Sequence, residues 1–221
     1  MRSNQKIFAE FIGTLLLVAT VVGSGAMAVN LSHDMGVQLL INTIATIFIL
    51  ALLIYLFADI SGSHFNPVVT ISELLQKRIG IQDALGYIAA QCAGGFMGAV
   101  LANLMFGNPA IFRSHHIRSG SNLFLSEVVA TAGLLFVIQL LGFQKKGAAA
   151  PFAVAAWIGG AYFFTSSTSF ANPAVTFARA WSDTFSGIAL RSVPVFVVAQ
   201  VVGASLGIGL SYLVKEKSHD R

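Results

Sequence analysis

The stretch "SFANPAVTFARAW", Ser169 to Trp181, decides how this chain folds, and a near-copy of it, "HFNPVVTISELL", occupies His64 to Leu75. Both stretches lie between long apolar runs, yet both place an Asn-Pro pair near their start. Asn is among the best N-cap residues, and Pro fits the first helical turn because its missing N–H is not needed there. The two Asn-Pro boxes therefore predict two helix starts inside an apolar chain.

The helices that follow the boxes are too short to cross a membrane. They are expected over Val68 to about Gln76 and over Ala174 to about Trp181. About 12 residues at 1.5 Å each reach ~18 Å, roughly half of the hydrocarbon core. We therefore predict two re-entrant half-helices. The irregular segments before them, "SGSH" and "TSSTSF", can lie at membrane depth only if they line protein or a water-filled cavity.

The composition is that of a membrane protein. The chain has 221 residues, of which 56% are hydrophobic and 10% are charged, whereas soluble domains carry about 25% charged residues. Six segments approach the ~20 apolar residues that span a bilayer. The first continues without a cleavage site, so we interpret it as a span and not as a signal peptide. The six spans are expected at about 7–29, 36–58, 82–106, 122–142, 147–165 and 190–214.

The basic residues orient the chain. If loops are numbered along it, nine basic residues fall at the termini and in the even-numbered loops, and four fall in the odd-numbered loops. By the positive-inside rule this distribution predicts cytoplasmic termini and a place in the cell's inner membrane. The net charge of +4 thus reflects how the chain is oriented in the membrane, and it does not indicate a surface for nucleic acid. The nine are Arg2, Lys6, Lys77, Arg78, Lys145, Lys146, Lys215, Lys217 and Arg221; the four are Arg113, Arg118, Arg179 and Arg191.

The chain repeats itself within one domain covering residues 1–221. Glu10 matches Glu127, Asn66 matches Asn172, and the "QCAGGFMG" that begins at Gln91 matches "QVVGASLG" further on. The halves cover about 5–106 and 122–214, with three spans each. Because three is odd, the halves enter the membrane from opposite sides, as in channels and transporters with a site near the midplane.

This arrangement brings the two half-helix N-termini together at the centre of the membrane. Each N-terminus carries about half a positive charge from the helix dipole. Two such ends repel cations, while the amides of Asn66 and Asn172 can donate hydrogen bonds to passing oxygens. The geometry suits neutral solutes that carry hydroxyl groups.

The segments "SGSHFNPVVT" and "FANPAVT", with the paired Glu and Gln residues, resemble the major intrinsic protein family, the aquaporins and aquaglyceroporins, over essentially the whole chain. The resemblance implies an all-α membrane protein with six transmembrane helices and two half-helices. It also implies a homotetramer embedded in lipid, with one pore in each protomer. We expect no enzyme activity, no cofactor and no metal.

The resemblance also assigns roles to residues. Glu10 and Glu127 would anchor the loops before the boxes, although a proton relay is an alternative for them. The pore boxes would be Asn66, Pro67, Val68, Asn172, Pro173 and Ala174. Solute-accepting carbonyls would come from Gly62, Ser63, His64, Phe65, Ser169, Phe170 and Ala171.

The outer constriction departs from the family pattern. The family usually has an arginine where this chain has Val175, and its other three positions fall on Thr46, Gly160 and Ser169. This set has neither an aromatic ring nor a charge, so we predict a wide and weakly polar selectivity filter. Arg179, one helical turn beyond Val175, could partly replace the missing charge, but we expect a structural or mouth-lining role.

The loop "TSSTSFANPAVTFAR" resembles that of the bacterial aquaglyceroporins associated with arsenic-resistance operons. This resemblance implies passive permeation of glycerol-like polyols and of metalloid hydroxides such as arsenite or methylated arsenicals, with some water. A water-selective aquaporin is the alternative within the family. An ion-coupled secondary transporter shares the inverted repeats, and a membrane enzyme would need a nucleophile–base pair that the chain lacks.

Two further features stay open. Asp59 stands where the family usually has His, and either a gate or a loop-anchoring hydrogen bond is possible there. His115 and His116 lie in the loop between the halves, where a solvated loop is the default and a metal or oxyanion site is the alternative.

Overall fold

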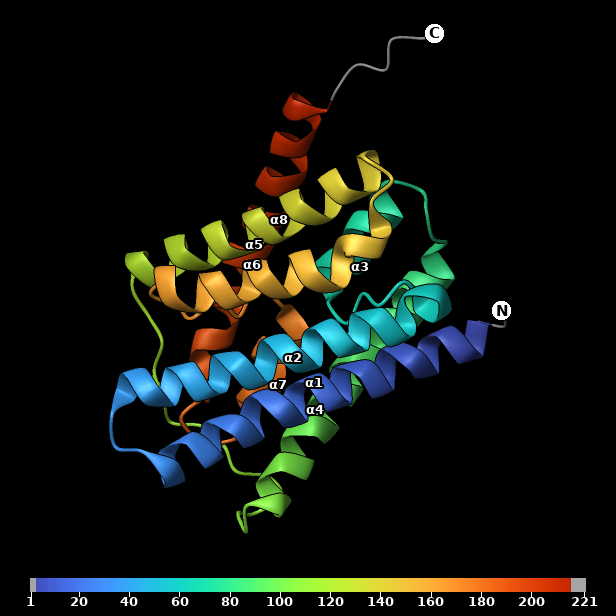
Figure 1. Ribbon diagram of the computed structural model, residues 1–221. Helices are drawn as coiled ribbons and strands as arrows, with labels where there is room; N and C mark the ends of the chain where they lie inside the picture. The colour runs from blue at the N-terminus through green and yellow to red at the C-terminus, as the bar shows by residue number, and fades with distance from the viewer. Residues whose placement is uncertain (1–2, 216–221) are drawn as a thin grey trace, which may run out of the picture.

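The computed structural model describes residues 3–215, and these contain helices and no β-strand. Six helices are long and apolar enough to cross a membrane, and two shorter ones, α3 and α7, lie among them (Figure 1). The predicted all-α architecture of six spans and two half-helices is confirmed. The long helices are α1 (Ser3–Leu31), α2 (Met35–Ser61), α4 (Ile81–Met105), α5 (Ser121–Phe143), α6 (Ala150–Phe164) and α8 (Val193–Val214). One 3₁₀ turn, η1 (Gly147–Ala149), leads into α6, and another, η2 (Leu190–Ser192), leads into α8.

The half-helices α3 (Pro67–Leu75) and α7 (Pro173–Arg179) begin where the Asn-Pro boxes predict. The side-chain oxygen of Asn66 accepts a hydrogen bond from the Val68 N–H at 3.1 Å, and that of Asn172 accepts from the Ala174 N–H at 3.0 Å. Helix α3 has 9 residues, as many as the expected range, whereas α7 has 7 and ends two residues before the expected end at Trp181. After α7 the chain tightens into i→i+3 bonds, as in the 3.1 Å bond from the Trp181 N–H to the Ala178 carbonyl, which ends the α-helix early.

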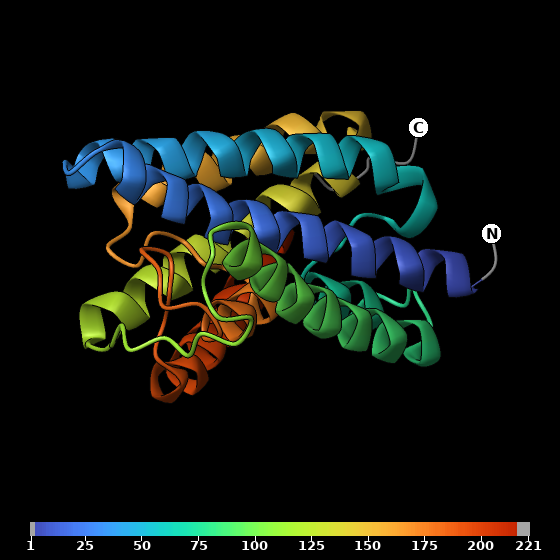
Figure 2. The same cartoon turned by 90° about the horizontal axis from the view of Figure 1, so that it is seen from below.

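Glycine allows the spans of each half to pack closely. Helix α1 lies against α4, and α5 lies against α8; Figure 2 shows α1 crossing α4. A Cβ atom on Gly98 would overlap the Leu15 carbonyl, and one on Gly207 would overlap the Ala132 carbonyl. The spacing of Gln, Gly and Gly in the two repeats therefore reflects close contact between helix backbones.

The two halves also interlock through the half-helices. Helix α7 packs against α4 of the first half, and α3 packs against α8 of the second half. The fold thus places both half-helices between the two sets of spans, with their Asn-capped ends toward each other.

The loop 106–120 that joins the halves lies along the segment 180–189 (Figure 2). The Ser114 N–H donates to the Ala180 carbonyl at 2.9 Å, and the Ala189 N–H donates to the His116 carbonyl at 2.6 Å. Arg118 donates to the Gly187 carbonyl at 2.9 Å. These bonds fix the loop over the end of the molecule where α7 finishes. Of the basic residues used to orient the chain, Arg2, Lys217 and Arg221 lie outside the described residues.

Candidate functional site

A cavity of about 140 Å³ lies between the two halves, with the starts of α3 and α7 in its wall. Four spans each supply a stripe of side chains four residues apart, which is the spacing of one helix face. On the same volume measure one water needs roughly 10–15 Å³, so the cavity can hold several waters or a small organic solute. The stripes are Leu17 and Val21 on α1, Thr46, Leu50 and Ile54 on α2, Leu134 and Ile138 on α5, and Ala150, Val154, Ile158 and Tyr162 on α6.

The two box asparagines meet in the middle of this cavity. Asn66 Nδ2 donates to the Ala171 carbonyl at 2.8 Å, and Asn172 Nδ2 donates to the Phe65 carbonyl at 2.7 Å. Each amide therefore binds the residue that precedes the other asparagine, which joins the halves across the centre. An amide nitrogen has two N–H groups, so each asparagine keeps one donor for a solute oxygen.

The loops before the boxes have matching backbone conformations. Left-handed φ values occur at Ser63 (52°) and Phe65 (47°), and again at Ser169 (50°) and Ala171 (48°). Each pair is 106 residues apart, the same separation as Asn66 and Asn172. Non-glycine residues in this region cost about 1–3 kcal/mol each and cluster at functional sites.

Two buried carboxylates hold these loops, as the resemblance implies. Glu10 accepts hydrogen bonds from the backbone N–H groups of His64 at 3.0 Å and Phe65 at 2.6 Å. Glu127 accepts from those of Phe170 and Ala171, both at 2.9 Å.

A glutamine completes each of these networks. Gln91 donates to Glu10 at 2.8 Å, and Gln200 donates to Glu127 at 2.7 Å. Glu10 accepts four hydrogen bonds, one of them from Ser61, and Glu127 accepts three, so the geometry supports anchoring rather than a proton relay.

Some residues of the boxes and their loops line the cavity, and the others pack around it. Asn66 and Asn172 line the cavity, as do all the residues expected to supply carbonyls: Gly62, Ser63, His64, Phe65, Ser169, Phe170 and Ala171. Among these, the carbonyls of Phe65 and Ala171 already accept an asparagine N–H. The remaining box residues, Pro67, Val68, Pro173 and Ala174, are not among the lining residues.

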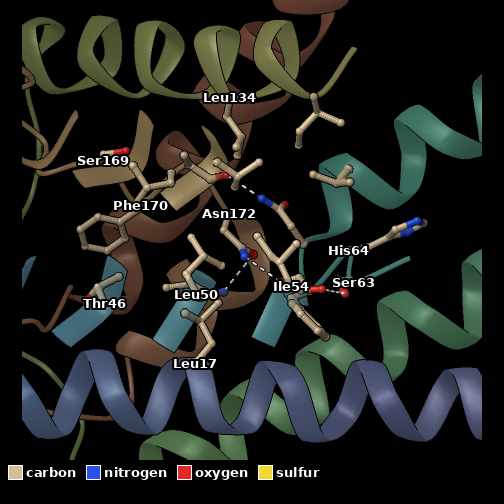
Figure 3. Close-up of a pocket in the computed structure, with 18 of the residues that line it drawn as sticks. Leu17, Thr46, Leu50, Ile54, Ser63, His64, Leu134, Ser169, Phe170 and Asn172 are labelled. Carbon is tan, nitrogen blue, oxygen red and sulfur yellow. Dashed lines mark hydrogen bonds between the residues drawn. The ribbon is translucent and has the colours of Figure 1, made fainter. Parts of the chain in front are cut away.

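Three of the four expected filter residues lie together, and the fourth does not. Thr46, Ser169 and Val175 line the cavity, and Figure 3 shows Thr46, Ser169 and Phe170 at the end opposite Ser63 and His64. Gly160 is exposed, and a Cβ atom on it would meet nothing within 4 Å. On α6 it faces away from the stripe that reaches the cavity.

Helix α6 contributes Tyr162 to the cavity wall near Thr46. Tyr162 is 3% exposed, lines the cavity, and its hydroxyl lies 3.3 Å from Thr46 Oγ1. Counting positions back from Asn172, as the family pattern does, led to Gly160 and missed Tyr162. The four-residue spacing places Tyr162 on one helix face with Ala150, Val154 and Ile158, but only the packing of α6 shows that this face lines the cavity.

His64 lies at the end of the cavity opposite Thr46 and Ser169 (Figure 3). Its ring nitrogen Nδ1 lies 3.0 Å from Thr70 Oγ1, and its ring contacts Tyr87 edge-to-face at 5.2 Å between centroids. Asp59 is exposed, and within residues 3–215 its side chain forms no hydrogen bond or ion pair. The expected loop-anchoring bond of Asp59 is therefore not found in the described part of the chain.

The paired histidines lie against an acidic residue, Asp183. His115 Nδ1 lies 2.8 Å from Asp183 Oδ2, and His116 Nε2 lies 3.9 Å from Asp183 Oδ1. Burial raises the pKa of Asp183, but hydrogen bonds from His115 and the attraction of both histidines outweigh it and lower the pKa below its ordinary value. In the described chain no group of three or more His, Cys, Asp or Glu side chains could hold a metal ion.

Known proteins share this sequence and this architecture. A family model described as "Major intrinsic protein" matches residues 1–168. Aquaglyceroporin AqpS from Rhizobium meliloti (strain 1021) is 45% identical over 207 residues, which are 94% of this chain and 88% of that protein. Aquaporin NIP3-1 from Arabidopsis thaliana is 28% identical, over 92% of this chain and 65% of that protein.

The fold has a solved counterpart. The X-ray structure of the aquaglyceroporin from Plasmodium falciparum matches with a TM-score of 0.69 at 21% identity, and the match covers 97% of this chain and 96% of that one. With the inverted repeat, the two half-helices and the central cavity, these similarities establish the class. The chain belongs to the major intrinsic protein family and is a multi-pass membrane channel for small uncharged solutes, not an enzyme.

Proposed function

We propose that this channel passes glycerol-like polyols and metalloid hydroxides such as arsenite or methylated arsenicals, together with some water. The main support for the proposal comes from the residue found at the outer end of the cavity. Val175 stands there in the place where the family usually has an arginine, and it is 5% exposed and lines the cavity. A valine at this position takes up less room than an arginine and carries neither its permanent charge nor its five hydrogen-bond donors.

The wall around Val175 suits solutes with one polar and one apolar side. Leu17, Val21 and Leu50 supply apolar surface along the cavity. Ser169 Oγ is buried, and no atom of the described residues hydrogen-bonds to it. Thr46 and Tyr162, whose hydroxyls lie 3.3 Å apart, add polar side chains to the wall of the same cavity. A polyol or a methylated arsenical can turn its hydroxyl toward these polar side chains and its carbon atoms toward Val175.

Transport is passive in this proposal. Coupling to an ion gradient would need a titratable or ion-binding group at the midplane, and the cavity between Asn66 and Asn172 is neutral there. The two helix N-termini that meet at the asparagines disfavour cations. The solute gradient alone then drives flux, which separates this function from that of a secondary transporter.

Stopped-flow light scattering on proteoliposomes tests the proposal. We expect glycerol and arsenite to enter faster than into empty liposomes, without saturation at low concentrations and without dependence on a proton or sodium gradient. Fast water flux with neither solute would make the pore water-selective. Uptake that follows an imposed ion gradient would instead indicate a transporter.

We also propose a homotetramer in the cell's inner membrane with both termini in the cytoplasm. The distribution of basic residues supports the orientation, and apolar side chains exposed on α2, α5 and α8 supply surface for lipid and for neighbouring protomers. Reporter fusions at each terminus would test the orientation, and native mass spectrometry would test the assembly. A reporter active outside the cell, or a protein that remains monomeric in lipid nanodiscs, would contradict these assignments.

A further inference from the structure

A buried arginine lies at the outer end of the cavity, four residues beyond Val175. Arg179 ends α7, is 2% exposed, and is one of the residues that line the cavity. No ion pair within residues 3–215 includes it. Because a buried charge without a counter-ion is costly, the position of this guanidinium requires an explanation.

The neighbours of Arg179 fix the plane of its guanidinium. Its Nε donates to the Ser186 carbonyl. Its guanidinium carbon lies 3.4 Å from the centre of the Phe170 ring, and that ring packs edge-to-face on Phe196 at 5.2 Å. The Phe170 backbone is in turn fixed by its bond to Glu127. A guanidinium stacked on an aromatic face in this way has little freedom to move.

The terminal nitrogens of Arg179 remain available to the cavity. In the described part of the chain they form no hydrogen bond, and they are not among the fully buried atoms that lack a partner. Oxygen atoms of water or solute inside the cavity can therefore satisfy them. Thr46, Tyr162 and Ser169 line the same cavity, so Arg179 shares its wall with other polar residues as well as with Val175.

We infer that Arg179, held against Phe170, is the specificity-determining residue of the outer constriction. Its guanidinium, which comes from a position four residues beyond the one where the family usually has an arginine, excludes cations and donates hydrogen bonds to hydroxyl-bearing solutes. Tyr162 takes part in the same polar wall. This inference rests on the proposed channel function and adds to it the group that sets charge selectivity. The guanidinium is always protonated and has five donors. A cation that approaches it is repelled, whereas a neutral solute accepts its hydrogen bonds.

Arg118 offers a matched control. Its guanidinium carbon lies 5.1 Å from the same Phe170 ring, but its side chain donates to the Gly187 and Phe185 carbonyls, and it is not among the residues that line the cavity. A role in holding the outer loops is shared by the two arginines. A role in the cavity belongs to Arg179 alone.

The test compares sodium and proton leak with glycerol permeability in proteoliposomes of the wild type, Arg179→Lys, Arg179→Gln and Arg118→Gln. We expect Arg179→Gln to raise cation leak at least about tenfold over the wild type, because a unit charge is lost within a few ångströms of the passing ion. Arg179→Lys and Arg118→Gln should keep the low leak. Glycerol flux should continue in all four proteins.

Three results would overturn the inference. They are an unchanged leak in a folded Arg179→Gln channel, an equal leak in the Lys and Gln variants, or an equal leak in Arg118→Gln. If the wild type and all variants exclude glycerol and arsenite while the leak still depends on Arg179, the proposed solutes are wrong and the role of Arg179 stands.

A measurement on the wild type covers the case in which the Arg179 variants do not fold. Methylglyoxal is a small neutral dicarbonyl that modifies accessible guanidinium groups, and mass spectrometry locates the modified arginines. We expect modification of exposed Arg113 and Arg191, of Arg179 through the cavity, and not of Arg118, and excess glycerol should slow the reaction at Arg179. An Arg179 that stays unmodified while Arg113 and Arg191 react would contradict its access to the cavity.

Discussion

Asn172 donates a hydrogen bond of 2.7 Å to the carbonyl of Phe65, a residue of the opposite repeat, while its side-chain oxygen caps its own half-helix. One amide group thus starts α7 and joins it to the loop before α3. Asn66 makes the equivalent pair of bonds to Ala171 and Val68. The centre of the channel is therefore held by the same two side chains that face the solute.

Replacing Asn172 by Asp separates these two roles. The carboxylate can still cap α7, but it loses the N–H that binds the Phe65 carbonyl and places a negative charge in the cavity. We expect the free energy of unfolding to fall by about 1–3 kcal/mol, with an increased sodium leak in proteoliposomes. The exposed Asn30→Asp is the control, and its unfolding free energy should change by less than about 0.5 kcal/mol. Equal melting temperatures for the two variants would contradict the bridging role.

Glu127→Gln should disrupt the second loop. Glu127 accepts backbone hydrogen bonds from Phe170 and Ala171 and a side-chain bond from Gln200. A neutral amide has only one accepting oxygen, so at least one buried N–H loses its partner, at a cost of about 1–3 kcal/mol.

The control for Glu127→Gln is Glu73→Gln, which breaks the ion pair of Glu73 with Arg78 and should cost about 1 kcal/mol or less. Thermal unfolding of both variants in detergent measures the difference. A Glu127→Gln protein as stable as Glu73→Gln would show that the carboxylate does not anchor the loop.

Val175→Arg should close the constriction to larger solutes. The new side chain would add a second guanidinium to a cavity of about 140 Å³ that Arg179 already lines. We expect glycerol and arsenite flux to fall about tenfold or more, which corresponds to roughly 1.4 kcal/mol in the barrier, while some water flux remains. Val175→Ala is the matched control and should keep or raise glycerol flux. Unchanged flux in the arginine variant would mean that Val175 does not line the narrowest point.

Gly207→Ala should destabilise the contact of α5 with α8. A Cβ atom at this position would overlap the Ala132 carbonyl, and overpacking of this kind costs typically 1–3 kcal/mol. Gly209 lies on the same helix, and a Cβ atom there would meet nothing within 4 Å. Gly209→Ala should therefore leave the thermal midpoint unchanged or raise it, since alanine favours helix over glycine. The expectation fails if both variants melt together.

Much of the site could be predicted because its parts are local. The Asn-Pro boxes determine where α3 and α7 begin, since N-capping involves only the next two or three residues. The 3.6-residue period places Thr46 on the same face as Leu50 and Ile54. The expectation for Gly160 relied on counting from the family pattern, whereas the face that α6 turns to the cavity depends on how α6 packs against α2.

The sequence by itself determined six spans, two half-helices, their inverted repetition and the missing arginine at position 175, because hydropathy, capping and proline chemistry act over a few neighbouring residues. Only the tertiary structure decided that Tyr162 faces the cavity, that the asparagines bind across the repeats, and that Arg179 stacks on Phe170. These relationships, including the contact of Tyr162 with Thr46, join residues that are between 9 and 116 positions apart. Their geometry depends on how whole helices pack, and a pattern among neighbouring residues in the sequence does not determine that packing.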